Sequence, residues 1–332
     1  MKILGIETSC DETAAAVVED GTKILSNIIA SSAEMHAKTG GVIPEEAARQ
    51  QVRSILPVIE EALGGKRDID AIAVTVGPGL IGSLLVGVET AKALSLLWKK
   101  PLIPVNHLVA HIYANWPGES PPPFPALALV VSGGHTDLVL MKGHGAIAWI
   151  GGTRDDAAGE AFDKSARLLG LPYPGGPSIA AEAAKLSGAK VKLNLFPRPM
   201  IAERNFDWSF SGLKTAVMRE VAANKKVSRE RLAAEVQEAI VDVLVEKTLA
   251  AVGKLKPKSL LLAGGVSANT RLREKFESEI AARKLDVDLR FPPPKLCTDN
   301  AVYIAASAFY NLSPSLWESV GAMPELTIVG QV

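Results

Sequence analysis

The stretch ILGIETSCDETAAAVV, residues 3–18, decides the fold that this sequence predicts. An apolar segment leads into small and polar residues, and a second apolar segment follows, which is typical of two strands joined by a tight turn. The stretch ALALVVSGGHTDLVLM, residues 126–141, repeats this order. The predicted strands are residues 3–5, 14–18, 126–131 and 137–141. An internal repeat of this kind predicts two halves with the same architecture.

Each half also contains an apolar segment that ends in glycine and leads into a helical pattern. Residues 71–76 precede Gly77 and Gly79, and residues 259–263 precede Gly264. The helices are expected at about residues 82–97 and 268–283. A glycine lets the backbone approach a ligand closely, and backbone N–H groups in such turns bind phosphates. We therefore predict a duplicated α/β ATPase core whose hairpin turns face one another across a nucleotide cleft.

The length of 332 residues suffices for two domains, each with its own core. A proline-rich segment, residues 117–125, is the expected linker between them. The first lobe is predicted at residues 1–116 and the second at residues 126–312. Within the second lobe we expect a helical, basic insertion at about residues 151–231, and residues 313–332 form a C-terminal tail.

Composition argues against several classes of protein. Basic and acidic residues number 36 each, so the chain as a whole is not a polycation that binds nucleic acid by net charge, although a local patch is allowed. Cys10 and Cys297 are too few for a disulfide scaffold. Glu7 follows a very short apolar run, unlike a secretory signal, and two charged residues interrupt the apolar residues 84–98. These features predict a soluble cytoplasmic protein.

His107 and His111 are the most informative side chains of the sequence. On a helix, residues four apart lie on one face, so both imidazoles can bind one metal ion. Asp299, in a short polar stretch between apolar segments, is a candidate third ligand. Two histidines and one carboxylate leave positions open for a substrate, an arrangement that suits iron or zinc. A lone pair of this spacing is also compatible with two ordinary histidines on a helix surface.

Eight segments, taken together, resemble the TsaD family, the tRNA N6-adenosine threonylcarbamoyltransferases. They are residues 5–13, 107–111, 132–136, 155–164, 173–177, 210–215, 264–269 and 297–300. The resemblance extends from Met1 to about Tyr310 and is to the bacterial branch of the family. It implies the fold shared by actin, sugar kinases and Hsp70-type chaperones, a duplicated actin-like ATPase fold with a nucleotide and metal cleft between two lobes.

The resemblance implies an acyltransferase that moves a threonylcarbamoyl group from threonylcarbamoyl-AMP to N6 of adenine 37 in tRNAs that read A-starting codons. His107, His111 and Asp299 would bind one divalent metal, iron in preference to zinc. Asp11, in the first hairpin turn, is the expected catalytic carboxylate. A simpler interpretation of Asp11 is a turn-forming residue that bonds its own backbone. Cys10 is interpreted as a small buried thiol, and Glu12 as structural or electrostatic.

The same resemblance assigns nucleotide contacts to the second half. Asp163 would contact the ribose, because a carboxylate accepts hydrogen bonds from two hydroxyls. Gly176 matches a contact to the threonyl group and Asn269 a contact on the adenine side. The phosphate-side strand and turn comprise Val130, Val131, Ser132, Gly133 and Gly134.

A basic region is expected to bind the tRNA backbone. Residues 185–231 contain eleven lysines and arginines against four acidic residues. Contacts of such side chains to phosphate fix position and make binding sensitive to salt. The candidates are Lys192, Arg198, Arg204 and Lys214. A solvated helical face is an equally good interpretation of residues 225–231.

The family implies two protein partners, a non-catalytic paralogue of the same fold (TsaB-like) and a small ATPase (TsaE-like). The paralogue is expected on residues 45–62 and 82–97, and the isolated chain should be nearly inactive. The sequence departs from the common family pattern at Gln51 and Ala180, and Gln51 is expected to tune partner contacts. Two other classes are weighed: a metalloendopeptidase, which would need a general-base glutamate after His107, and a non-enzymatic, chaperone-like nucleotide-binding scaffold.

Overall fold

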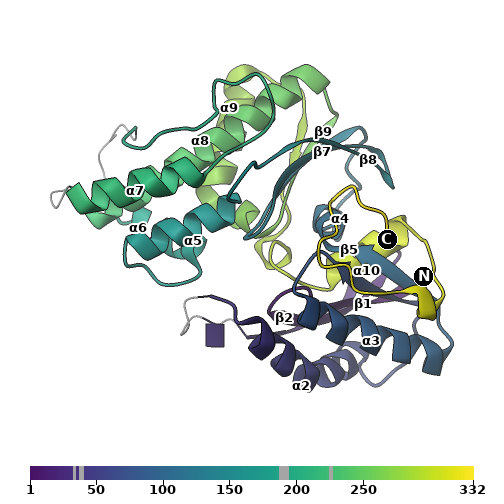
Figure 1. The fold of residues 1–332 in the computed structure, drawn as a ribbon. Coiled ribbons are helices and arrows are strands. Elements are labelled where there is room, and N and C mark those ends of the chain that lie inside the picture. Colours follow the sequence, from purple (N-terminus) through teal and green to yellow (C-terminus); the bar gives the residue numbers. More distant parts are fainter. Residues whose placement is uncertain (33–34, 37–40, 187–193, 224–226) are drawn as a thin grey trace. The chain divides into compact units, whose positions relative to one another are not determined.

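The computed structural model describes residues 1–32, 35–36, 41–186, 194–223 and 227–332. The chain forms two compact units, each built around a five-stranded sheet (Figure 1). The first unit comprises Met1–Pro122, Gly143–Ile147 and Pro292–Val332. The second comprises Pro123–Lys142 and Ala148–Phe291.

The first sheet has the strand order β3-β2-β1-β4-β5. Strand β1 pairs antiparallel with β2 and parallel with β4, as the predicted hairpin and glycine-ended strand require. All seven residues of β4 are buried, which explains its uninterrupted apolar sequence. The strands are β1 (Lys2–Glu7), β2 (Glu12–Glu19), β3 (Lys23–Ser31), β4 (Ala71–Gly77) and β5 (Leu102–Asn106).

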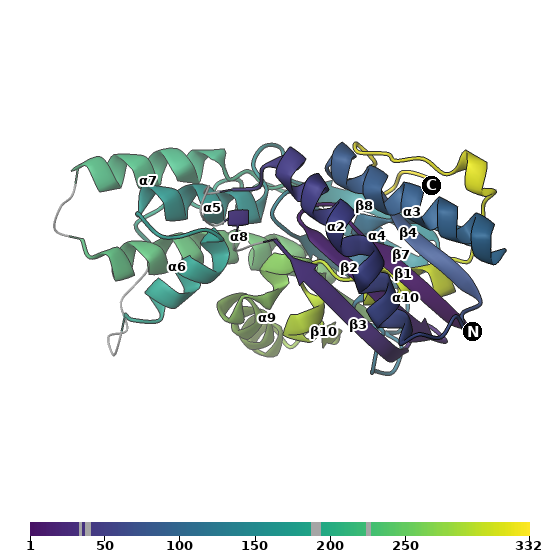
Figure 2. The ribbon, with the colours of Figure 1, turned by 90° about the horizontal axis from the view of Figure 1, so that it is seen from below.

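Alternate residues of β1 enter two different cores of the first unit. Leu4 and Ile6 pack in the core that includes residues of α2 (Pro44–Leu63) and α3 (Ile81–Trp98). Ile3 lies in the core with α10 (Val302–Tyr310) and α4 (His107–Tyr113). Gly5 faces α10 so closely that a Cβ atom would lie 2.3 Å from the carbonyl oxygen of Ala301, so only glycine fits there. Figure 2 shows α2 and α3 running beside this sheet.

Helix α3 is long and apolar enough to cross a membrane by length and composition alone. One third of its 18-residue window is buried, and it packs against β4 and α2. A helix of this composition that covers a sheet is equally typical of a soluble domain.

The segment from Pro292 to Val332 lies in the first unit, whereas the sequence interpretation placed residues 292–312 in the second lobe. The physical reason is α10, whose apolar side chains complete the core beneath β1. Its residues from Val302 to Ala308 are all buried. The boundary differs because the chain returns to its first unit after the second unit is complete.

The second sheet has the order β10-β9-β6-β7-β8, which repeats the topology of the first. Strand β6 pairs antiparallel with β7 and parallel with β9. The predicted internal repeat is therefore confirmed at the level of strand pairing. The strands are β6 (Ala126–Val131), β7 (Thr136–Gly143), β8 (Ala146–Gly152), β9 (Ser259–Ala263) and β10 (Asp288–Arg290).

Helices of the second unit share a hydrophobic core with strands of its sheet, and the longest, α8, contributes most of the buried helical residues of this unit. The helices are α5 (Ala158–Leu168), α6 (Gly175–Ala183), α7 (Ser211–Ala223), α8 (Arg229–Leu255) and α9 (Thr270–Arg283). Short 3₁₀ turns occur at η1 (Gly265–Ala268), η2 (Pro294–Leu296) and η3 (Trp317–Ser319).

Helices α8 and α9 are joined by a half-buried ionic cluster around Glu238. Its carboxylate accepts hydrogen bonds from Arg271 at 2.7 and 2.8 Å and from Lys275 at 2.6 Å. Burial by itself raises the pKa of Glu238, but the two cations outweigh it and lower the pKa to about 2. The ionised carboxylate therefore stabilises the folded unit.

We expect Glu238→Gln to lower the free energy of unfolding at pH 7 by about 2 kcal/mol, because hydrogen bonds between charged groups contribute about 1.5–3 kcal/mol. The folded pKa lies below the ordinary value of 4.5, so this contribution exists above pH 4.5 and is lost as pH falls toward 2. Urea denaturation at pH 7 and pH 3 measures it. Glu246→Gln, in a more exposed pair with Arg283, is the control. An equal deficit at both pH values would contradict the assignment.

Candidate active site

The two histidines are placed by the junction between β5 and α4. The side chain of Asn106 caps α4, accepting hydrogen bonds from the backbone N–H groups of Leu108 at 3.0 Å and Val109 at 3.3 Å. His107 is therefore the first residue of the helix, and His111 lies one turn later on the same face. Both imidazoles are buried.

Asp299 meets this histidine pair within the first unit. The two histidine Nε2 atoms lie 3.2 Å apart, and Oδ1 of Asp299 lies 3.3 Å from Nε2 of His111 and 3.7 Å from Nε2 of His107. Metal ions bind such atoms at about 2.0–2.2 Å, which separates neighbouring donors by about 3–3.5 Å. The three donors therefore fit one metal ion, and they converge as the sequence pattern predicted.

Glu7, at the end of β1, orients the first histidine. This carboxylate is fully buried, and its Oε2 lies 3.0 Å from Nδ1 of His107. The Glu7 carboxylate accepts two further hydrogen bonds. The Thr75 hydroxyl donates to Oε2 at 2.6 Å, and the backbone N–H of Ser9 donates to Oε1 at 2.5 Å. A proton held on Nδ1 leaves the Nε2 lone pair directed at the other two donors.

Sequence reasoning did not identify Glu7 as part of the site. The available signal was a charged residue within an otherwise apolar strand, since acidic residues are rarely fully buried unless they are paired. The sequence did not indicate this partner of His107 because the two residues lie 100 positions apart in the chain. Tyr303 completes the surroundings, with its hydroxyl 3.3 Å from Oδ1 of Asp299.

The charges of this cluster favour a bound cation. Burial lowers the pKa of His107, but Glu7 and Asp299 outweigh it and raise the pKa to about 9. Burial and the neighbouring His107 lower the pKa of His111. Burial opposes ionisation of Asp299, yet the two histidines hold the pKa of its carboxyl well below the ordinary value. Two carboxylates and two imidazoles together are balanced by one divalent ion.

The turn between β1 and β2 carries Cys10, Asp11 and Glu12. Burial raises the pKa of the Cys10 thiol well above its usual value, which agrees with the interpretation of an inert thiol. Burial also raises the pKa of Glu12 to about 7. Ser9, two residues before Asp11, has its hydroxyl 3.3 Å from Nδ1 of His107, so the turn adjoins the histidine pair.

The second unit contains the corresponding turn, between β6 and β7. The backbone N–H of Gly159, at the start of α5, donates to the carbonyl of Ser132 at 3.1 Å. Gly264 has a φ of 84°, and a Cβ atom there would lie 2.3 Å from the carbonyl oxygen of Val131. Gly133 and Gly134 have open space where a side chain would project. Both residues are exposed, so the turn leaves room for the phosphate contact that the sequence pattern predicts.

The remaining helical candidates for nucleotide contacts lie at or beside the starts of two helices, α6 and α9. Asp163 accepts the backbone N–H of Gly175 at 2.6 Å through Oδ1, and burial raises the pKa of its carboxyl. Gly176 has open space at its Cβ position. Asn269 caps α9, accepting from Leu272 at 3.0 Å, and donates to Gln237 at 3.0 Å. Both ends of the Asn269 amide are thus already engaged. Val130 and Val131 are fully buried in β6 and offer only their backbone.

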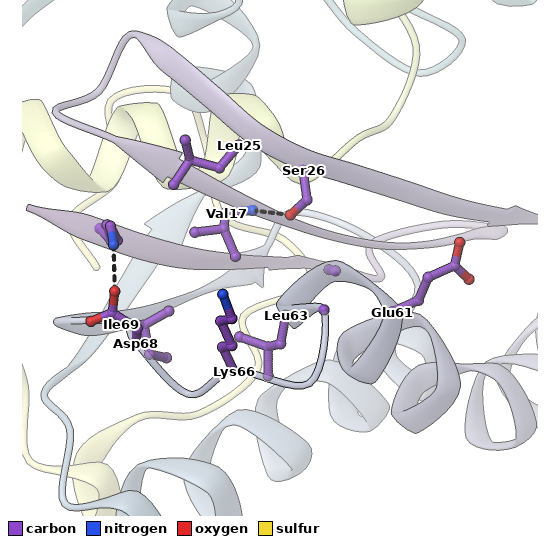
Figure 3. Close-up of a pocket in the computed structure, with 11 residues that line it drawn as sticks. Val17, Leu25, Ser26, Glu61, Leu63, Lys66, Asp68 and Ile69 are labelled. Atoms are coloured by element: carbon purple, nitrogen blue, oxygen red, sulfur yellow. Dashed lines mark hydrogen bonds and ion pairs between the residues drawn. The ribbon is translucent and has the colours of Figure 1, made fainter.

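A separate hollow of about 500 Å³ lies in the first unit (Figure 3). It is lined by Lys2, at the opposite end of β1 from Glu7, and by Val17 and Ser26, whose hydroxyl accepts a backbone hydrogen bond from Val17 at 3.1 Å. Lys2 is paired with Asp68 on its rim. The hollow is not part of the histidine cluster.

Comparison with known proteins agrees with this geometry. A family model described as tRNA N6-adenosine threonylcarbamoyltransferase, TsaD, matches residues 23–306. Proteins with that name from Thermomicrobium roseum and Dehalococcoides mccartyi are 52% and 54% identical to the chain, covering 93% of it and 92% and 93% of their own lengths. The chain belongs to the TsaD family. The resemblance drawn from the eight sequence segments is confirmed.

Solved structures show the fold of this TsaD chain. The (R)-2-hydroxyglutaryl-CoA dehydratase component A of Acidaminococcus fermentans has a TM-score of 0.55 at 16% identity, covering 93% of this chain and 98% of that one. Full-length HypF in a phosphate- and nucleotide-bound form has a TM-score of 0.60 at 12% identity, covering 95% of this chain and 56% of that one. These likenesses, with the repeated sheet topology, confirm the predicted actin-like fold.

The TsaD family acts on tRNA, and the four candidate contacts differ in availability. Arg198 is paired with Asp242 at 2.8 Å and donates to the carbonyl of Phe196 at 2.6 Å, so it already stabilises the second unit. Arg204 and Lys214 are exposed. Lys192 lies outside the described residues.

We expect Glu7→Gln to weaken metal binding about 10–100-fold, because the amide no longer supplies the charge that holds the His107 proton on Nδ1. Titration against a chromophoric chelator measures the affinity for zinc. Glu12→Gln is a matched control, since Glu12 is a partly buried carboxylate of the adjacent strand that accepts a hydrogen bond from the Ser31 hydroxyl and does not belong to the group of three ligands. Unchanged affinity in Glu7→Gln would remove this carboxylate from the metal centre.

Proposed function

We propose that this chain transfers the threonylcarbamoyl group of threonylcarbamoyl-AMP to N6 of adenine 37 in tRNAs that read A-starting codons. The convergence of His107, His111 and Asp299 within one unit is the observation that carries the proposal. Membership of the TsaD family supports it. The reaction forms a bond between N6 and the donor carbonyl carbon, breaks the bond from that carbon to the AMP phosphate oxygen, and releases the N6 proton.

We assign His107, His111 and Asp299 as ligands of one divalent ion, Fe²⁺ in preference to Zn²⁺. The ion supplies Lewis acidity toward oxygen atoms of the donor. Glu7 keeps the imidazole of His107 in the tautomer that binds metal, through its contact at 3.0 Å. The position after His107 is Leu108, so the chain lacks the general-base glutamate of a His-Glu-x-x-His peptidase.

Asp11 is the proposed catalytic carboxylate. The N6 lone pair of adenine is delocalised into the ring, so attack requires a base to remove the proton as the new bond forms. A carboxylate serves this role, and the turn that bears Asp11 adjoins His107 through Ser9. Burial raises the pKa of the Cys10 thiol, which disfavours the thiolate form that a nucleophile requires.

The second unit would bind the adenylate part of the donor. Its open glycine turn, Gly133 and Gly134, offers backbone N–H groups to the phosphate. Asp163 would accept from the ribose hydroxyls, and Gly176 leaves room for the threonyl group. Arg204 and Lys214 are the exposed candidates for tRNA phosphates. We place this activity in the cytoplasm, where tRNA is modified and thiols stay reduced.

The partner paralogue would dock on the outer face of α2 and α3. Val52 and Leu56 on α2 are 63% and 54% exposed, and Leu97 on α3 is 70% exposed. These helices pack against one another and present apolar side chains to solvent, which favours a protein partner. A small ATPase is the second proposed partner, and only the family resemblance supports this proposal.

We expect Asp11→Ala to lower the rate of tRNA modification by at least about 10²-fold, the usual contribution of a general base. The reaction contains unmodified tRNA, donor, metal and partners, and nucleoside analysis by mass spectrometry measures threonylcarbamoyladenosine. Circular dichroism and zinc affinity check that the variant keeps its fold and metal centre. Full activity of Asp11→Ala would refute the catalytic assignment.

We expect Leu56→Glu to abolish co-elution with the paralogue, because the interface would then bury an unpaired charge. Met218→Glu is the control, since Met218 is 49% exposed on a helix of the second unit. Size-exclusion chromatography of the mixed proteins measures the complex. Undiminished complex formation by Leu56→Glu would move the docking face away from α2.

A further inference from the structure

The backbone of the Asp11 turn is held by side chains from outside it. The amide nitrogen Nε2 of Gln51 donates to the carbonyl oxygen of Cys10 at 3.0 Å and to that of Glu12 at 3.0 Å. The hydroxyl of Ser32 donates to the carbonyl oxygen of Asp11 at 2.6 Å. Three successive carbonyl groups, centred on Asp11, are therefore anchored.

Gln51 is an unusual residue to find at its position. It is 1% exposed, on the buried side of α2 beside apolar residues such as Ala47 and Ile55. Its Oε1 has no hydrogen-bond partner among the described residues, which costs free energy in a buried place. An apolar side chain would avoid that cost, so packing alone does not account for the amide. The two hydrogen bonds that Gln51 donates to the turn do account for it.

We propose that Gln51 is a positioning residue for Asp11, which it aligns by fixing the carbonyl groups on either side. The proposal rests on the catalytic assignment of Asp11 above. Without the amide donors, the Cys10 and Glu12 carbonyls lose their partners and the turn relaxes toward other arrangements. A displacement of about 1 Å of a reacting group commonly costs about 10²-fold in rate.

This role differs from the one that the sequence suggested, in which Gln51 tunes partner contacts. The side chain points into the unit, whereas the adjacent Val52 and the next-turn Leu56 are exposed on the proposed docking face. One helix therefore carries the docking residues outside and the anchor of the Asp11 turn inside.

The test uses Gln51→Met, which keeps the length of the side chain and removes its donors. We expect kcat for tRNA modification to fall about 10–100-fold. The KM values for tRNA and donor and the affinity for zinc should stay within about twofold of wild type. Gln51→His, which returns one N–H donor, should recover at least part of kcat. Gln50→Met, at the exposed neighbouring glutamine, is the matched control and should behave as wild type.

Thermal unfolding of each variant shows that rates are measured on folded protein, at least 15 °C below the midpoint. If Gln51→Met does not fold, Gln51→Leu replaces it, because leucine also fits an apolar helix face and has no hydrogen-bond donor. A kcat within twofold of wild type in a folded donor-less variant overturns the proposal. So does a loss that Gln51→His fails to relieve. Full activity of Asp11→Ala would instead refute the catalytic assignment of Asp11, on which this inference rests.

Discussion

A fully buried carboxylate, Glu7, is the constraint on which the first unit depends. A charge removed from water must be compensated, and here the Thr75 hydroxyl, the Ser9 backbone and the imidazole of His107 provide the partners. These contacts tie β1 to β4, to the hairpin turn and to α4. The same contacts that compensate the charge therefore also arrange the parts of the site, and the fold and the chemistry share one set of hydrogen bonds.

The elements that sequence could predict are those with local, periodic signals. The predicted bounds of the two hairpins and of the glycine-ended strands β4 and β9 lie within one or two residues of the observed ones. Apolar runs and the glycines that end them are local properties of the sequence, so they can be recognised without the structure. The spacing of His107 and His111 fixed their common face for the same reason. The convergence of Asp299 on this pair followed from its chemistry together with the family resemblance.

Other features depend on contacts between residues far apart, and a single sequence does not encode them visibly. Glu7 meets a histidine 100 residues away, and Gln51 meets a turn about 40 residues before it. The pairing of Arg198 with Asp242 is of the same kind, since an arginine within a basic region looks like a nucleic-acid contact until its partner is known. The domain boundary at Pro292 was missed because nothing in the local composition shows that α10 fits beneath β1.

The return of residues 292–332 to the first unit has a consequence for biosynthesis. A ribosome makes the chain from its N-terminus, so β1 to β5 emerge long before α10 and Asp299 do. Until then the face of this sheet that packs against α10 is uncovered, and the two histidines lack the carboxylate that we propose as a third ligand. The second unit, by contrast, is contiguous apart from residues 143–147, so its parts are synthesised in direct succession. If these three residues bind a metal ion as proposed, their site would be complete only when synthesis of the chain is nearly finished.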